Sequence, residues 1–246
     1  MTNSTTFLAC VAGLNIAVTA KHPSVQQSFH YFRTEGKAPD FTISVDDELF
    51  AFVKRMHNSV NPTASDARIE SIALQYALCR EALYYDCLVL HASSLQMNGK
   101  AYVFSAPSKT GKSTHSRMWR EVFGDRVSMI NDDMPLLRRK DGSWFVCGTP
   151  WNGKHGLGFN CIVPLKAVTL LSRGDDRIRP FDPQQDLPYL LNQVFRPYEA
   201  ELLAATLNLL DKLLAEAPLF HLFCTPTHNA AKLAKAYIKE GNIHEN

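Results

Sequence analysis

The chain has 246 residues, of which 46% are hydrophobic and 20% are charged. This composition is typical of a globular protein with a buried core and excludes a disordered chain or a fibrous repeat. The formal net charge is +2, and the basic residues are scattered along the chain, so we expect no nucleic-acid partner.

Six cysteines are widely separated and none forms a CxxC pair, which predicts buried, reduced thiols. The first six residues are polar and lack the basic and apolar stretches of a secretory signal. No segment reaches the roughly 18 apolar residues of a membrane span. We therefore expect a cytoplasmic protein without a membrane partner.

Residues 1–85 are predicted to form a small β-rich lobe that ends in a connecting helix. Residues 6–20 indicate two short strands around Gly13-Leu14-Asn15, and residues 41–45 alternate with the period of a strand. Apolar residues then recur at helical spacing over 65–85, where Ser65 is a suitable helix cap.

Residues 86–246 are predicted to form an α/β core. Two apolar runs, 88–91 and 101–104, predict a hairpin whose tight turn is Asn98-Gly99. A helix is expected over 112–123 and a strand over 127–130. A second turn, Asp141-Gly142, separates strand candidates at 136–137 and 144–146.

The end of the chain continues this alternation of strands and helices. A buried strand is expected at 165–171, and residues 182–216 predict one or two helices interrupted at Pro188 and Pro197. After a last strand at 219–224, Thr225 and Pro226 predict a helix start, and Gly241 predicts its end.

A phosphate-binding loop is the main motif of the sequence. Its spacing fits GxxxxGK[ST], except that Ala106 replaces the first glycine. In such a loop the backbone N–H groups and the helix N-terminus surround a phosphate, Lys112 bridges the β- and γ-phosphates of ATP, and Ser113 binds Mg²⁺. Nine residues are assigned to this nucleotide site: Ala106, Pro107, Ser108, Lys109, Thr110, Gly111, Lys112, Ser113 and Thr114.

Two adjacent carboxylates, Asp132 and Asp133, follow the expected strand at 127–130. A strand parallel to the one before the loop would bring them to the same edge of the sheet, where ligands bind. Phosphoryl transfer to a hydroxyl requires one carboxylate to hold the metal and another to orient or accept the proton. Turn residues or a helix cap are the alternative interpretation of this pair.

These segments resemble the HPr kinase/phosphorylase-like serine kinases, whose core is akin to that of phosphoenolpyruvate carboxykinase. The similarity covers about residues 88–179 and rests on LHASS with His91, SAPSKTGKST, the NDD triplet and GTPWNGKHG at 148–156. It implies an ATP- and Mg²⁺-dependent kinase of this P-loop fold, with a small N-terminal lobe.

The resemblance also implies roles for single residues. Asp132 would be the catalytic base, Asp133 and Ser113 would bind Mg²⁺, and the order of the two aspartates stays open. His91 would lie near the acceptor, with a structural histidine as the equal alternative. Weaker candidates for phosphate or substrate contacts are Lys154, His155 and Arg173.

The acceptor implied by the resemblance is a serine of a peptide or protein, as in accessory kinases of peptide-modification pathways. The segment that follows the Asp pair, Thr149 to His155, lacks the acidic signature of enzymes that also catalyse phosphorolysis, so kinase activity alone is expected. Related enzymes assemble into rings, which leaves a homo-oligomer open.

Two other functions fit the same motifs. A carboxykinase-like phosphotransferase acting on a small acid would need a cluster of arginines. Its candidates are Arg173, Arg177, Arg179 and Arg196. A non-catalytic ATP-binding switch or assembly factor would bind nucleotide and transfer nothing.

Overall fold

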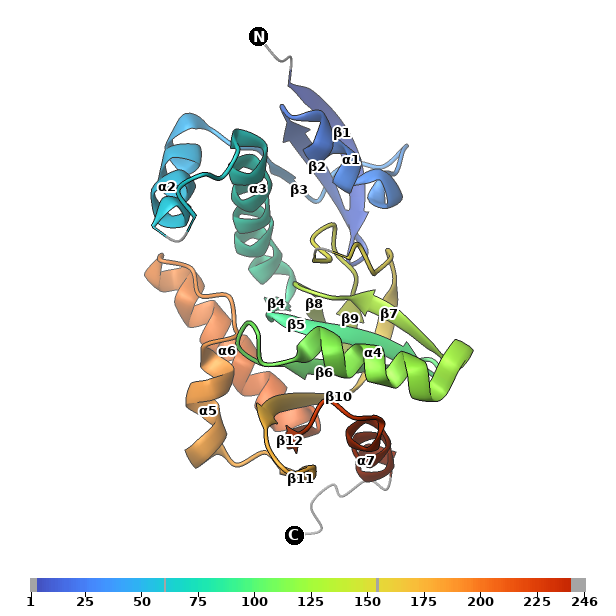
Figure 1. The fold of residues 1–246 in the computed structure, drawn as a ribbon. Coiled ribbons are helices and arrows are strands. Elements are labelled where there is room, and N and C mark those ends of the chain that lie inside the picture. The colour runs from blue at the N-terminus through green and yellow to red at the C-terminus, as the bar shows by residue number, and fades with distance from the viewer. Residues whose placement is uncertain (1–3, 60, 154, 240–246) are drawn as a thin grey trace. The chain divides into compact units, whose positions relative to one another are not determined.

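The computed structural model describes residues 4–59, 61–153 and 155–239. The chain divides into two compact units, Met1–Tyr85 and Asp86–Asn246 (Figure 1). The protein is a mixed α/β protein, and each unit has a sheet of its own.

The sheet of the first unit has the order β1-β2-β3 within the described residues. β1 (Thr5–Val11) and β2 (Leu14–Ala20) form an antiparallel hairpin, and β3 (Phe41–Ile43) pairs with β2 in parallel. The predicted strands are confirmed. The turn lies at Ala12 and Gly13, which both have positive φ, so Leu14 and Asn15 already belong to β2.

The first unit was predicted to be rich in β-strands, but it also contains three α-helices in its described residues. They are α1 (Pro23–Ser28), α2 (Asp47–Asn58) and α3 (Asp66–Ala82). Ser65 caps α3 as predicted, by accepting a hydrogen bond from the amide of Arg68. The prediction missed α2, which buries Val53 against Ile69 and Ala73 of α3.

The second unit contains a nine-stranded mixed sheet in its described residues, with the order β4-β8-β9-β10-β6-β5-β7. In addition, β12 pairs with β10, and β11 pairs with β12. Its strands are β4 (Cys87–Val89), β5 (Ala92–Met97), β6 (Lys100–Ser105), β7 (Val127–Asn131), β8 (Leu136–Lys140), β9 (Ser143–Cys147), β10 (Ile162–Arg173), β11 (Arg177–Pro180) and β12 (Leu219–Cys224).

The predicted hairpin has the right turn and the wrong first strand. Asn98 and Gly99, with φ of 53° and 69°, join β5 to β6, whereas β4 pairs with β8. The residues of β5 were not predicted as a strand because three of them, Ser93, Ser94 and Gln96, are polar. Ser93 and Ser94 are nevertheless buried, since each hydroxyl has a hydrogen-bond partner, Ser116 and the carbonyl of Asn131.

Strand directions decide where the ends of the strands meet. β6, β10 and β12 are mutually parallel, and β5 is antiparallel to both β6 and β7. β7 therefore runs in the same direction as β6, with β5 between them. The residues that follow β6, β7, β10 and β12 all emerge at one edge of the sheet, as does the residue that precedes β5.

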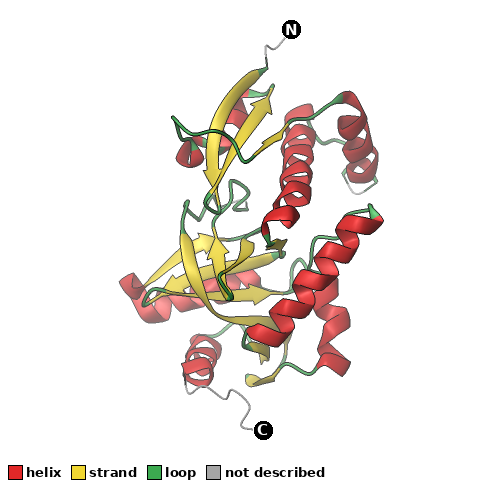
Figure 2. Cartoon of the chain, turned by 180° about the vertical axis from the view of Figure 1, so that it is seen from behind, coloured by secondary structure: helices red, strands yellow, loops and turns green. Residues whose placement is uncertain are grey.

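The described part of this unit also has four α-helices, which are α4 (Lys112–Phe123), α5 (Pro183–Leu191), α6 (Ala200–Glu216) and α7 (His228–Lys239). α4 and α7 pack on one face of the sheet through Trp119 and Ile238 (Figures 1 and 2). His221 alternates with Phe220 and Leu222 on β12, so it lies on the opposite face, where Asp186 of α5 contacts it.

Two boundary predictions need correction. Pro188 lies inside α5, and the chain leaves the helix only after Leu191. α7 begins at His228 rather than at Pro226. Gly241, its predicted end, lies outside the described residues. Within the described part of the chain, no helix combines the length and the hydropathy needed to cross a bilayer. All six cysteines are free, as predicted, but only Cys79, Cys87 and Cys147 are buried, whereas the other three are partly exposed.

Candidate active site

The loop of residues 106–111 connects β6 to α4. Ala106, which occupies the position of the first glycine of the motif, is fully buried in the core. Lys109 has a left-handed φ of 67°, and Gly111 has φ 128°, a value that side chains disfavour. Gly111 is also the N-cap of α4, which is left without a side-chain cap and has no acidic residue in its first turn. The amides at this helix end are thus available to an anion.

Lys112 is the first residue of α4, and its side chain folds back over the loop of residues 106–111. Its Nζ donates to the carbonyl of Ala106 over 2.7 Å. Burial lowers the pKa of Lys112 to about 8, and the carboxylates of Asp133 and then Asp132 oppose this shift. The ammonium group and both carboxylates are therefore close enough to interact, although they come from separate segments of the sequence.

Asn131 holds the two aspartates in place. Its Oδ1 accepts hydrogen bonds from the amides of Asp133 and Met134, over 2.9 and 2.8 Å. Its Nδ2 donates to the hydroxyl of Thr149 over 3.0 Å, and that hydroxyl donates to the carbonyl of Met134. The Asp pair thus lies in a turn with its geometry fixed by two buried side chains, neither of which was assigned a role from the sequence.

The glycine-containing segment 148–158 packs against this turn. A Cβ on Gly148 would lie 2.0 Å from the carbonyl oxygen of Phe159, and one on Gly158 would lie 2.7 Å from that of Ile130. Gly153 lies beside the backbone of Asp132. The resemblance singled out residues 148–156, and Gly153 allows the close approach of this segment to the backbone of Asp132.

Asp132 has a buried carboxylate oxygen that lacks a protein partner. The residue is 9% exposed, and its Oδ1 has no hydrogen bond to any residue that the structure describes. A buried unpaired carboxylate oxygen is unfavourable unless a cation or donor binds it. The carboxylates of Asp132 and Asp133 and the hydroxyl of the exposed Ser113 are oxygen ligands of the kind that Mg²⁺ prefers.

The protein residues alone do not complete a metal shell. No cluster of three or more His, Cys, Asp or Glu side chains suited to a metal ion occurs among the described residues. Mg²⁺ is usually bound through one or two carboxylates together with substrate phosphates and water. The Asp pair fits that type of site.

His91 lies beside Asp133 at the start of β5. Its Nε2 is 3.8 Å from Oδ1 of Asp133, and its Nδ1 is 3.1 Å from Oε1 of Gln193. Burial and the nearby Lys112 lower the pKa of His91, so the ring is neutral at pH 7. The backbone carbonyl of Gln193 also accepts a hydrogen bond from the amide of His91, and this residue fixes the imidazole from the loop that follows α5.

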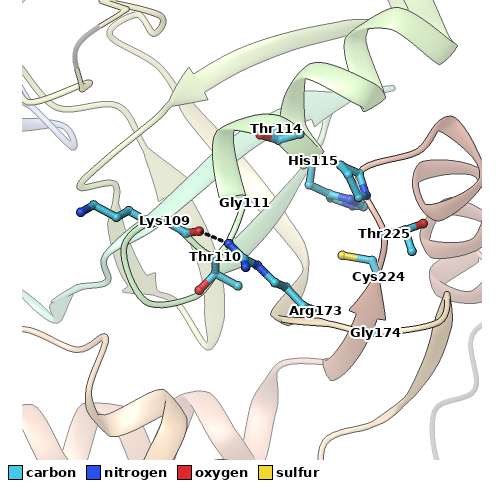
Figure 3. A pocket seen from close by; sticks show the side chains of 10 residues that line it. Lys109, Thr110, Gly111, Thr114, His115, Arg173, Gly174, Cys224 and Thr225 are labelled. Atoms are coloured by element: carbon cyan, nitrogen blue, oxygen red, sulfur yellow. Dashed lines mark hydrogen bonds between the residues drawn. The ribbon is translucent and has the colours of Figure 1, made fainter.

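A cavity of about 460 Å³ adjoins the loop on its other side (Figure 3). It is lined by Lys109, Thr110, Gly111, Thr114, His115, Arg173, Gly174, Cys224, Thr225 and Pro226. Its walls come from the ends of β10 and β12 and from the first turn of α4. Burial lowers the pKa of His115 to about 4, against a smaller opposing effect of Asp176, so this ring too is neutral at pH 7.

The weaker candidates have different outcomes. Lys154 lies outside the described residues, and His155 is exposed. Arg173 donates to the carbonyl of Lys109 over 3.0 Å, so it supports the loop (Figure 3). Of the four arginines considered for a small-acid substrate, Arg179 is already held in a two-bond ion pair with Asp186.

Asp186 is the centre of a buried network on the opposite face of the sheet. Besides Arg179, it contacts Nδ1 of His221 over 2.7 Å and the amide of Asp182 over 2.8 Å. Burial acts to raise the pKa of Asp186, but the hydrogen bonds from Arg179, from the Asp182 amide and from His221 outweigh it and lower the pKa to about 2. The carboxylate therefore stabilises the fold.

Replacing Asp186 with asparagine is expected to reduce the free energy of unfolding at pH 7 by about 3 kcal/mol, because it leaves Arg179 and His221 without their anion. The folded-state pKa is below the unfolded value of 3.8, so this stabilisation is present above about pH 4 and is lost as the pH falls toward 2. Urea unfolding at pH 7 and pH 3 measures both effects. The exposed Asp211→Asn serves as the control, and equal stability of Asp186→Asn and the wild type at pH 7 would contradict the prediction.

No protein-family model matches the chain, and no curated protein matches it in sequence. Among solved structures, the chain is similar to the HPr(Ser) kinase/phosphatase from Coxiella burnetii, with a TM-score of 0.34 and 13% identity. The match covers 62% of this chain and 94% of that chain. At this degree of similarity, a function for the chain has to be inferred from the site itself.

Proposed function

We propose that this protein is an ATP- and Mg²⁺-dependent kinase that transfers the γ-phosphoryl group to a hydroxyl, with a serine of a peptide or protein as the acceptor. The observation that carries the proposal is the meeting of Lys112 with Asp132 and Asp133 at one sheet edge. A cation beside uncapped helix amides suits a polyphosphate, and two carboxylates opposite it suit a metal and an acceptor.

The triphosphate would lie over the 106–111 loop. The amides at the start of α4 and the Lys112 ammonium would contact the β- and γ-phosphates, and Lys112 would exchange its bond to the Ala106 carbonyl for a phosphate oxygen. The nucleoside would occupy the adjacent cavity, whose volume lies within the range of small-molecule sites.

Asp132 and Ser113 are the proposed magnesium ligands. The unpartnered Oδ1 of Asp132 supports this role, since it is the buried oxygen that still needs a cation. When bound, Mg²⁺ neutralises the charge on the phosphates during transfer. The resemblance gave Asp132 the role of the base and Asp133 that of the metal ligand, with the order left open. We propose the reverse order.

Asp133 is then the proposed base. Its side chain is 40% exposed, so an incoming hydroxyl has access to it, and Nε2 of His91 lies 3.8 Å away. Gln193 accepts a hydrogen bond from Nδ1 of the neutral His91, which leaves Nε2 unprotonated, and this nitrogen would accept a hydrogen bond from the acceptor hydroxyl. An open acceptor side also suits a hydroxyl that is carried on a larger chain.

The proposal is tested by mixing the purified protein with ATP, Mg²⁺ and serine peptides and measuring ADP formation and phosphopeptide mass. Lys112→Ala should weaken ATP binding about 10- to 100-fold, the effect of losing a charge-assisted hydrogen bond. Lys100→Ala, an exposed lysine at the other end of β6, should bind ATP as the wild type does.

The outcomes separate the candidate functions. No ATP binding by the wild type would reject the kinase and the switch together. ATP binding without transfer to peptides, free serine or small acids would favour the non-catalytic switch. Transfer to a small carboxylic acid and not to serine would favour the carboxykinase-like enzyme, which the pairing of Arg179 with Asp186 argues against.

A further inference from the structure

His115 is a buried polar side chain in the wall of the cavity beside the loop. It is 3% exposed, lies one turn beyond Lys112 on α4, and is one of the residues that line the cavity (Figure 3). Its ring packs edge-on against Phe104, with 4.6 Å between centroids. The ring is thus held rigidly where the proposed nucleoside would lie.

Trp119 determines which nitrogen of His115 carries the proton. The indole Nε1–H donates to Nε2 of His115 over 3.0 Å. An indole nitrogen is a donor only, so Nε2 has to be the unprotonated acceptor, and the proton of the neutral ring is on Nδ1. No hydrogen bond joins this Nδ1–H to another described residue, so the donor is available to a ligand in the cavity that His115 lines.

The opposite wall of the cavity is also fixed. Asp176 accepts hydrogen bonds from the amide and the hydroxyl of Thr225, over 2.7 and 2.8 Å, and from the hydroxyl of Thr227 over 3.2 Å. The turn after β12 is therefore tied to the turn after β10. A nucleoside between these walls would have little freedom to move away from His115.

We propose that Nδ1–H of His115 donates a hydrogen bond to a neutral acceptor of the nucleoside, and that Trp119 is the positioning residue that keeps this donor in place. The acceptors nearest the phosphate chain are a ribose hydroxyl and N7 of a purine, and either one matches a donor only one helical turn beyond Lys112. The inference rests on the proposed function, because it assumes that a nucleotide occupies the cavity.

The test compares the affinities for ATP, 7-deaza-ATP, 2′-deoxy-ATP and 3′-deoxy-ATP in the wild type. We expect one analogue to bind about tenfold more weakly than ATP, the effect of one lost hydrogen bond, and its identity reveals the acceptor. The double variant His115→Phe/Trp119→Phe removes the imidazole and the indole together, so no polar group of this pair is left without its partner. In this variant, ATP and that analogue should bind equally.

Trp119→Phe alone frees the tautomer of His115 and should reduce the discrimination while the imidazole remains. A merely structural role of His115 would lower all four affinities by the same factor, so an unchanged ratio in the double variant would overturn the proposal. Equal binding of all four nucleotides by the wild type would overturn it as well. Failure of the wild type to bind ATP at all would instead reject the proposed function.

Discussion

Asp133→Asn is expected to lower phosphoryl transfer by about two to four orders of magnitude, the usual contribution of a general base. The substitution preserves the shape of the side chain and its contact with His91, and it removes the proton acceptor. ATP affinity should change little, because the loop amides and Lys112 remain. Single-turnover transfer and equilibrium nucleotide binding measure the two quantities separately.

Asp132→Asn is the matched variant for this prediction. If Asp132 holds the metal, its loss should raise the Mg²⁺ concentration needed for half-maximal transfer, and excess Mg²⁺ should restore part of the rate. Asp133→Asn should not respond to added Mg²⁺. The reverse pattern would exchange the two roles, and full activity of both variants would contradict any part for this pair in transfer.

Gly148→Ala is expected to lower the free energy of unfolding by about 3 kcal/mol, at the upper end of the range for an overpacked core. The new Cβ would lie 2.0 Å from the Phe159 carbonyl, a backbone atom that cannot rotate away. Since the same segment packs against the turn of Asp132, transfer should fall as well. Chemical denaturation followed by tryptophan fluorescence measures the loss of stability.

Gly156→Ala is the control within the same segment. A Cβ added at this position would meet only open space, and the φ of 61° is left-handed, so only backbone strain of about 1 kcal/mol is expected. If Gly148→Ala destabilises the protein no more than Gly156→Ala does, the close packing of Gly148 against the Phe159 carbonyl is incorrect.

Local signals in the sequence predicted much of the fold. The turns at Asn98-Gly99 and Asp141-Gly142 lie where positive φ was expected, and α4 has its predicted bounds. These features depend on a few neighbouring residues. The same holds for Ser65, whose side chain caps α3 through a contact three residues away.

The errors come from interactions between distant residues. β5 was missed because Ser93 and Ser94 look exposed until α4 and β7 supply their partners. Pro188 was expected to interrupt a helix, yet α5 continues past it to Leu191, and the neighbouring Leu190 is buried. Burial of Val53 against α3 likewise stabilises α2, which the β-rich prediction of the first sixty residues overlooked.

The candidate site shows the same division. The loop and the Asp pair could be predicted because each is a continuous motif. Gln193 and His115 could not, since their significance depends on His91 and Trp119, and on a cavity built from separate strand ends. Asn131 had a usable signal: an asparagine directly before two aspartates is a frequent way to close a turn through its side chain.

The antiparallel strand β5 sets the width of the gap that a substrate has to span. Two strand spacings, about 9 to 10 Å in all, separate the axis of β6 from that of β7. With β5 between them, the loop after β6 and the Asp pair after β7 start from strands that are not direct neighbours, and His91 directly precedes the strand that separates them.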